Sequence, residues 1–287
     1  WQATEDFSAG RISAPVALMR LALTGLPAAA IVTALEEDEG LASLLALARQ
    51  QSAGLRQIEA MVRSGAEHGP GASPEAAVAA SRAMFDRLVQ ISPEASVAAY
   101  SLGDPALLEM ASAEVAAWLR GLGLLDGRPR ILDLGCGIGR MAQALAPQAG
   151  GILGLDVSHV MIEAARLRCA DIPGLEFALT SGHGLDRLPA ATFDLLLAVD
   201  VFPYLVQAGG ALAERHVADA GRLLRPGGSL VILNFSYRGL DQDQADLRAL
   251  AERHGFELLR NGTRELALWD ACAFWLRHRA RPDSAWP

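Results

Sequence analysis

Residues 131–140, with the sequence ILDLGCGIGR, contain a glycine-rich turn whose residue types and spacing could take part in chemistry. The apolar start reads as a strand and the end as the beginning of a helix, with Gly135, Gly137 and Gly139 between them. Glycines allow a tight backbone turn and let a ligand approach where a Cβ would clash. The spacing is G-x-G-x-G, whereas the dinucleotide fingerprint G-x-G-x-x-G would require glycine where Arg140 stands. The turn predicts a ligand site on backbone atoms.

An acidic residue gives this turn a partner. Asp156 ends the next apolar run, GILGLD. A carboxylate at the end of the second strand can accept hydrogen bonds from both hydroxyls of a ribose that lies over the loop. The pair therefore predicts a nucleoside-containing cofactor.

The elements that must hold these residues alternate after Arg130. We expect strands at Ile131–Leu134, Ile152–Leu155, Leu175–Leu179, Phe193–Val199 and Leu230–Leu233. We expect helices at Met141–Leu145, Val160–Cys169 and Ala211–Leu224. Such alternation is typical of a doubly wound, mostly parallel α/β sheet. Two further strand-like runs, Phe256–Leu259 and Leu266–Leu276, flank Asn261-Gly262-Thr263 and predict an antiparallel terminal hairpin.

The region before the sheet is expected to be helical. Leu41, Leu44, Leu45 and Leu55 form an apolar stripe that something must cover, and a helix is expected at 75–90. The apolar stretch 12–35 is interrupted by Arg20, so we expect two short buried helices there and no membrane span. Residues 65–74 are the best linker candidate. We divide the chain into a helical lid or dimerisation region, 1–90, and a cofactor-binding domain, 91–287.

The ordered motifs resemble those of the class I S-adenosylmethionine-dependent methyltransferases. ILDLGCGIG resembles the family's first motif, GLDVSHVMIEAAR its second-strand motif, LPAATFDLLLAVDVFPYL its fourth-strand motif and LRPGGSLVIL the strand that follows. The resemblance covers residues 100–277. It implies a seven-stranded sheet whose last strand is antiparallel, S-adenosylmethionine as cofactor, and methyl transfer as the reaction.

The resemblance also implies roles for single residues. Gly135, Gly137 and Gly139, with Cys136 between them, would line the methionine and ribose, and Asp133 would support the loop. Asp156 would hold the ribose, and Val157 and Met161 would flank the adenine, although Met161 reads equally well as core. The acid that usually bonds the adenine amino group is missing, so His183, Gly184 or Asp186 would take its place. Tyr100 would cover the methionine end or simply pack.

Residues for the chemistry are expected where the fourth and fifth strands end. Asp200 would orient the acceptor or the cofactor's amino group, unless it caps a turn, and Tyr204 would wall the acceptor. Phe202 reads equally well as wall or core, and Asn234 and Tyr237 point to the same mouth.

Among the histidines, His183 is the best candidate for a base, because it lies in the cofactor loop. His216 and His254 lie in helical stretches and are expected at the surface.

The composition of the chain restricts which classes of binding partner are expected. The formal net charge is −8 and all 25 basic residues are Arg, which argues against nucleic acid and excludes Lys chemistry. The three cysteines, at 136, 169 and 272, form no metal-binding pair and suit a reducing, cytoplasmic compartment. We therefore expect a small-molecule acceptor, no metal, no membrane partner, and either a lid or a homodimer built from the N-terminal helices.

Three alternatives stay open at this point. A nicotinamide-dependent oxidoreductase would share the glycine loop and the ribose acid. A protein that binds S-adenosylmethionine without turnover would share the whole cofactor site. A protein could also replace the small molecule as methyl acceptor.

Overall fold

The computed structural model describes residues 1–65 and 73–279. Within these ranges the chain forms two compact units. Of the described residues, the first contains 1–65, 83–117 and 266–270, and the second contains 73–82, 118–265 and 271–279. The first unit therefore draws on three separate segments rather than ending at residue 90. Its role as lid or dimerisation region stays a prediction, and most of the predicted linker 65–74 lies outside the described residues.

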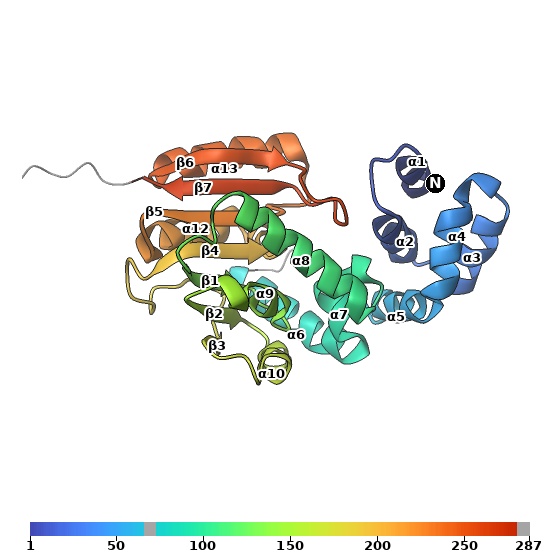
Figure 1. The fold of residues 1–287 in the computed structure, drawn as a ribbon, viewed down its shortest axis with the longest axis horizontal. Coiled ribbons are helices and arrows are strands. Elements are labelled where there is room, and N and C mark those ends of the chain that lie inside the picture. The colour runs from blue at the N-terminus through green and yellow to red at the C-terminus, as the bar shows by residue number, and fades with distance from the viewer. Residues whose placement is uncertain (66–72, 280–287) are drawn as a thin grey trace, which may run out of the picture. The chain divides into compact units, whose positions relative to one another are not determined.

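Helices build most of the first unit, which also contains the non-helical segment 266–270. They are α1 (Gln2–Ser8), α2 (Ala14–Leu23), α3 (Ala28–Glu36), η1 (Glu39–Leu41), α4 (Ala42–Gln50), α5 (Ser52–Arg63), the second half of α6 (Pro74–Ile91), α7 (Pro93–Val97), η2 (Ala99–Ser101) and most of α8 (Pro105–Gly121) (Figure 1). The two short helices expected between residues 12 and 35 are confirmed. Ser13 caps α2 by accepting a hydrogen bond from the backbone N–H of Val16.

The apolar stripe of the N-terminal helices is covered within this unit. Helix α2 packs against α4 and α5, and α3 packs against α4. Leu44, Leu55 and Ile58 are fully buried as a result. Several short helices thus bury together much of the stripe that one helical hairpin would leave exposed, while the lid or dimerisation role of these helices stays a prediction.

One mixed sheet forms the second unit, and it confirms the predicted fold class (Figure 1). Its seven strands lie in the order β3-β2-β1-β4-β5-β7-β6. They are β1 (Arg130–Leu134), β2 (Gly151–Asp156), β3 (Leu175–Leu179), β4 (Phe193–Val199), β5 (Leu224–Leu233), β6 (Phe256–Thr263) and β7 (Ala273–His278). The first five pair in parallel, and β7 runs antiparallel to both β5 and β6.

Besides the first half of α6 and the end of α8, the helices of this unit are α9 (Arg140–Leu145), η3 (Ala146–Gln148), α10 (His159–Arg168), α11 (Phe202–Ala208), α12 (Gly210–Leu223) and α13 (Leu240–Arg253). One face of the sheet packs on apolar residues of α11, α12 and α13. All four residues Ile131–Leu134 of β1 are buried, as expected for a strand that is covered on both faces of the sheet.

The terminal hairpin differs from its prediction in one respect. Asn261, Gly262 and Thr263 belong to β6 rather than to a turn. Gly262 has a φ of 79° and lies at a register shift between β6 and β7, which is typical of a β-bulge. The connection to β7 instead runs through residues 264–272, of which Leu266–Asp270 belong to the first unit.

Among the residues that the structure describes, no helix is both long and apolar enough to cross a membrane.

Candidate functional site

The glycine turn occupies the point where the strand order reverses. Strand β1 lies between β2 and β4, and its carboxyl end leads into Gly135, Gly137 and Gly139. These glycines have φ values of 68°, 51° and 77°, a left-handed region that residues with side chains rarely adopt. A Cβ at Gly135 would lie 1.9 Å from Cγ2 of Val201. The turn is therefore restricted to glycine by its backbone and, at Gly135, by its neighbour.

Strand β2 holds the turn in place. The backbone N–H groups of Gly135 and Cys136 both donate to the carbonyl oxygen of Leu155, at 2.7 and 3.0 Å. The backbone N–H of Gly137 donates to Oδ2 of Asp156 at 2.9 Å. The other oxygen, Oδ1, accepts the backbone N–H of Ser158 at 2.9 Å. The predicted partner residues thus lie together, with Asp156 bonded directly to the loop.

Asp133 is a second buried acid next to this carboxylate. Its side chain is 1% exposed, and its Oδ2 has no hydrogen-bond partner among the described residues. Burial raises the pKa of Asp133 to about 7; the buried Arg140 opposes this rise, and the charge of Asp156 adds to it. A buried carboxyl oxygen without a partner is costly, and it is a feature that a bound polar group would relieve.

Cys136 contributes its backbone rather than its thiol. Its side chain is 5% exposed, and its Sγ lies 2.9 Å from where a Cβ on Gly154 would be. Burial raises the pKa of this thiol well above its usual value, so it stays protonated at neutral pH. The thiol therefore packs against the sheet behind the loop.

The residues expected around the adenine lie along two neighbouring segments. Val157 follows β2, and its Cγ1 is 2.8 Å from where a Cβ on Gly182 would be. The Cγ1 of Val78, from the start of α6, is 2.9 Å from where the same Cβ on Gly182 would be. Met161 is 1% exposed, and its N–H is capped by Ser158. The loop after β3 is thus lined by valines, and Met161 is buried.

The same loop contains His183, Gly184 and Asp186. The imidazole of His183 is half-buried, and its backbone N–H donates to Oγ of Ser181 at 3.3 Å. The exposed carboxylate of Asp186 pairs with Arg215 at 3.3 Å, and the Arg215 guanidinium also lies against Gly184. The side chain of Asp186 therefore already has a cationic partner.

A polar cluster forms where β4 and β5 end. Asp200 Oδ1 accepts hydrogen bonds from Asn234 Nδ2 at 3.1 Å and from the Tyr237 hydroxyl at 3.0 Å. The phenols of Tyr204 and Tyr237 share a hydrogen bond. Burial raises the pKa of Tyr204 above its usual value, and the charge of Asp200 adds to this effect. Val201, which contacts Gly135, directly follows Asp200, so this cluster borders the glycine turn.

Two further residues predicted for the site, Phe202 and Tyr100, stack on other aromatic rings. Phe202 is core, 1% exposed, and it stacks on Phe235 with ring centroids 5.6 Å apart. Tyr100 belongs to the first unit and stacks on Trp269 at 5.2 Å. Among the described residues, no group of three or more His, Cys, Asp and Glu side chains could hold a metal ion.

One histidine expectation is wrong. His216 is 2% exposed, and its Nδ1 lies 2.9 Å from the carbonyl oxygen of Leu212. It shares the buried face of α12 with Leu212, Val217 and Ala220, which the spacing of apolar residues in 212–220 could have indicated. His254 is partly buried and pairs with Glu214 at 3.1 Å.

Comparison with known proteins identifies the domain. Residues 132–232 match the family model of the methyltransferase domain. The chain is 36% identical over 157 residues to an uncharacterised 37.1 kDa protein of transposon TN4556 from Streptomyces fradiae, covering 51% of this chain and 44% of that protein. It is 31% identical over 160 residues to the demethylmenaquinone methyltransferase of Tropheryma whipplei (strain Twist), covering 54% of this chain and 59% of that enzyme. The chain thus spans about half the length of these relatives.

A solved structure shares the fold. The phosphoethanolamine N-methyltransferase 1 of Haemonchus contortus, solved with phosphoethanolamine and S-adenosylhomocysteine, superposes with a TM-score of 0.54 at 15% identity, covering 74% of this chain and 51% of that one. At this identity the likeness concerns the fold alone. The likeness in fold and the matched methyltransferase domain agree with the class I S-adenosylmethionine-dependent family that the sequence motifs resemble.

Proposed function

We propose that this chain is an S-adenosylmethionine-dependent methyltransferase that acts on a small-molecule acceptor. The observation that carries the proposal is the bond between the Asp156 carboxylate and the Gly137 N–H, within a matched methyltransferase domain. Three left-handed glycines at alternate positions and an acid at the end of the second strand suit a nucleoside cofactor laid across the turn.

The residues present fit this cofactor. Asp133 Oδ2 lacks a hydrogen-bond partner among the described residues, and an ammonium group or its bound water would supply one. Gly135, Gly137 and Gly139 would line the methionine and ribose, Asp156 would accept from the ribose hydroxyls, and Val157 would flank the adenine. S-adenosylmethionine supplies an electrophilic methyl group on a positively charged sulfur when bound.

The polar cluster would serve the acceptor. Asp200 carries a carboxylate beside the two phenols of Tyr204 and Tyr237, next to the glycine turn. Such a group can orient a hydroxyl or amine nucleophile and accept its proton, while the phenols fix the carboxylate. His183 is the alternative base, because its half-buried imidazole lies in the loop that would border the cofactor.

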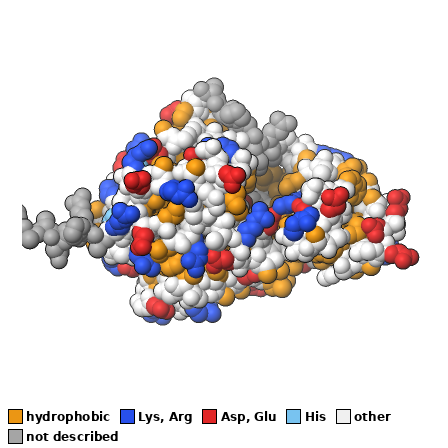
Figure 2. All heavy atoms as spheres, turned by 90° about the horizontal axis from the view of Figure 1, so that it is seen from above, with side chains coloured by type: hydrophobic (Ala, Val, Ile, Leu, Met, Phe, Trp, Pro, Cys, Tyr) orange, Lys and Arg blue, Asp and Glu red, His pale blue; other side chains and the backbone are white. Residues whose placement is uncertain are grey.

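Charge and relatives support a small molecule. The net charge is −8, and on the face drawn in Figure 2 arginine and acidic side chains of the described residues are interspersed rather than separated into a basic patch. The name of the demethylmenaquinone methyltransferase relative also points to a small acceptor. The free cysteines suit a reducing compartment, so the proposal includes a cytoplasmic location.

The role of the N-terminal helices belongs to the same proposal. We expect them to restrict which acceptor enters, or to pair with a second chain. Gel filtration of the intact protein tests the second arrangement, and a single monomeric species would remove it.

Calorimetric titration tests the cofactor directly. The intact protein is titrated with S-adenosylhomocysteine and, separately, with NAD. We expect saturable binding of the first and none of the second. Binding of NAD alone would overturn the proposal in favour of an oxidoreductase.

A labelling experiment then tests turnover and acceptor class. Methyl-labelled S-adenosylmethionine is incubated with the protein and either a small-molecule extract or a protein extract of cells. Label transferred to small molecules is the expected result. Label on protein would change the acceptor class, and cofactor binding with no label in either extract would favour a binding protein without turnover.

A further inference from the structure

The side chains of Asp200 and Asn234 are hydrogen-bonded to each other. The two residues follow the ends of the adjacent strands β4 and β5, and Asn234 Nδ2 donates to Asp200 Oδ1 at 3.1 Å. Both have left-handed backbones, with φ values of 58° and 63°. Asp and Asn are the residues with side chains that tolerate this conformation best. The Asp200 carboxylate therefore extends from a left-handed backbone position and accepts a hydrogen bond from the Asn234 amide.

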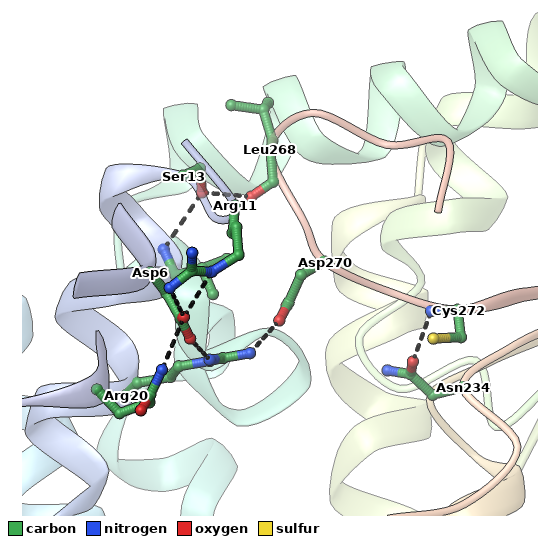
Figure 3. Close-up of polar contacts among 10 residues, drawn as sticks. Asp6, Arg11, Ser13, Arg20, Asn234, Leu268, Asp270 and Cys272 are labelled. Carbon is green, nitrogen blue, oxygen red and sulfur yellow. Dashed lines mark hydrogen bonds and ion pairs between the residues drawn. The ribbon is translucent and has the colours of Figure 1, made fainter. Parts of the chain in front are cut away.

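Asn234 is itself fixed by the residue that precedes β7. Its backbone N–H donates to the carbonyl oxygen of Cys272 at 2.9 Å. Its side-chain Oδ1 accepts the backbone N–H of Cys272 at 3.0 Å (Figure 3). With its amide oxygen engaged in this way, Asn234 has its Nδ2 directed toward Asp200. The position of Cys272 thus sets the side chain that holds Asp200.

Cys272 ends a connection whose preceding residues, Leu266–Asp270, we call the strap. The strap belongs to the first unit, although the strands on either side of it belong to the sheet. Ser13 Oγ donates to the carbonyl oxygen of Leu268 at 2.8 Å. The carboxylate of Glu114 accepts the backbone N–H groups of Ala267 and Leu268, at 2.6 and 3.1 Å. The backbone of the strap is therefore bound by residues far away in the sequence.

Side chains fix the strap as well. The Arg20 guanidinium pairs with Asp270 at 2.6 Å and with Asp6 at 3.0 Å (Figure 3). Trp269 is 5% exposed and stacks on Tyr100. One residue, Ala271, separates Asp270 from Cys272. Because an extended chain spans at most about 3.6 Å per residue, Cys272 must stay within about 7 Å of Asp270, so a displacement of Asp270 restricts where Cys272 can lie.

We propose that Asn234 is a positioning residue for Asp200 and that the strap sets Asn234 through Cys272. The proposal rests on the proposed function, in which Asp200 faces the methyl acceptor. In this arrangement, the contacts of Arg20, Ser13 and Glu114 with the strap help to orient the carboxylate of Asp200. Any event that moves the strap would then reorient Asp200 without touching the glycine turn.

The tyrosines provide a readout that needs no acceptor. The chain has three, Tyr100, Tyr204 and Tyr237. Tyr204 and Tyr237 belong to the Asp200 cluster, and Tyr100 stacks on the strap residue Trp269. Tyrosine labelled with ¹³C at Cζ therefore gives one signal for the strap and two for the cluster. Single Tyr→Phe variants assign the three signals.

The test compares two arginines that share a partner. Arg20→Gln removes the ion pair with Asp270, whereas Arg11→Gln removes an ion pair with Asp6 that does not involve the strap. We expect Arg20→Gln to displace the Tyr204 and Tyr237 signals and Arg11→Gln to leave them in place. Asp270→Asn, which preserves side-chain shape, should reproduce the effect of Arg20→Gln. Asn234→Ala should displace the Tyr237 signal most, because it removes the amide from Asp200.

Two results would overturn the proposal. One is an unchanged Tyr237 signal in folded Asn234→Ala protein. The other is unchanged Tyr204 and Tyr237 signals in both Arg20→Gln and Asp270→Asn, whether or not Tyr100 moves. Titration of the wild-type protein with S-adenosylhomocysteine examines the proposed function separately, since failure to bind it would leave the tyrosine results intact.

Discussion

The carboxylate of Asp156 accepts the backbone N–H of Gly137 at 2.9 Å, across 19 positions of sequence. Its second oxygen accepts the N–H of Ser158, so the same side chain joins the glycine turn to the start of α10. The acid therefore shapes the loop before any cofactor arrives, and a preformed loop lowers the cost of binding.

The first prediction concerns this acid. Asp156→Ala should weaken S-adenosylhomocysteine binding by roughly 1–3 kcal/mol, because hydroxyl groups lose a charged acceptor and the loop loses its anchor. Calorimetric titration measures the change. Glu163→Gln is the matched control, since Glu163 is an exposed acid on the following helix. Unchanged affinity in a folded Asp156→Ala protein would remove Asp156 from the cofactor site.

A second prediction concerns the turn. Gly137→Val should abolish S-adenosylhomocysteine binding, because a branched side chain is strained at a φ of 51° and would occupy the space of the cofactor. Gly151→Ala is the control, since a Cβ there would meet its nearest neighbour at an ordinary 3.7 Å. A folded Gly137→Val protein with normal affinity would show that the cofactor does not approach this turn.

Local patterns predicted the sheet well and long-range contacts poorly. The turn at residues 135–139 and the runs around it carry their own signals, because glycine spacing and apolar runs are properties of adjacent residues. Gly262 was misread as part of a hairpin turn, since a β-bulge uses the same residue type and is set by register with β7.

The contacts of the strap show more clearly what local sequence patterns cannot predict. Ser13 and Leu268 are bonded across 255 positions of sequence, and no local pattern links them. Trp269 and Cys272 therefore went unnoticed as structural anchors. Asn234 and Tyr237 do lie beside Asp200, because the ends of neighbouring parallel strands meet at one edge of the sheet.

A third prediction concerns the stack of Tyr100 on Trp269. A double-mutant cycle with Tyr100→Leu and Trp269→Leu should give a coupling free energy of about 0.5–1.5 kcal/mol in chemical unfolding, as for other aromatic pairs. Titration of Tyr100→Leu with S-adenosylhomocysteine separates packing from the predicted cover over the methionine end. Additive unfolding energies would contradict the stack, and reduced affinity would support the cover.

The last prediction concerns pH and the buried carboxyl of Asp133. Burial raises its pKa in the folded protein to about 7, from a usual value of 3.8. Between these values the folded protein keeps a proton that the unfolded chain has released. The stability contributed by this group is therefore present in full below about pH 4 and is lost as the pH rises through about 7. Asp133→Asn has no proton to lose, so its Tm relative to that of wild type should rise from pH 5 to pH 8. Thermal unfolding of both proteins without cofactor, in matched buffers, measures this difference. A difference in Tm that stays constant across the range would show that the pKa of Asp133 is not raised in the folded protein, although its Oδ2 has no hydrogen-bond partner among the described residues.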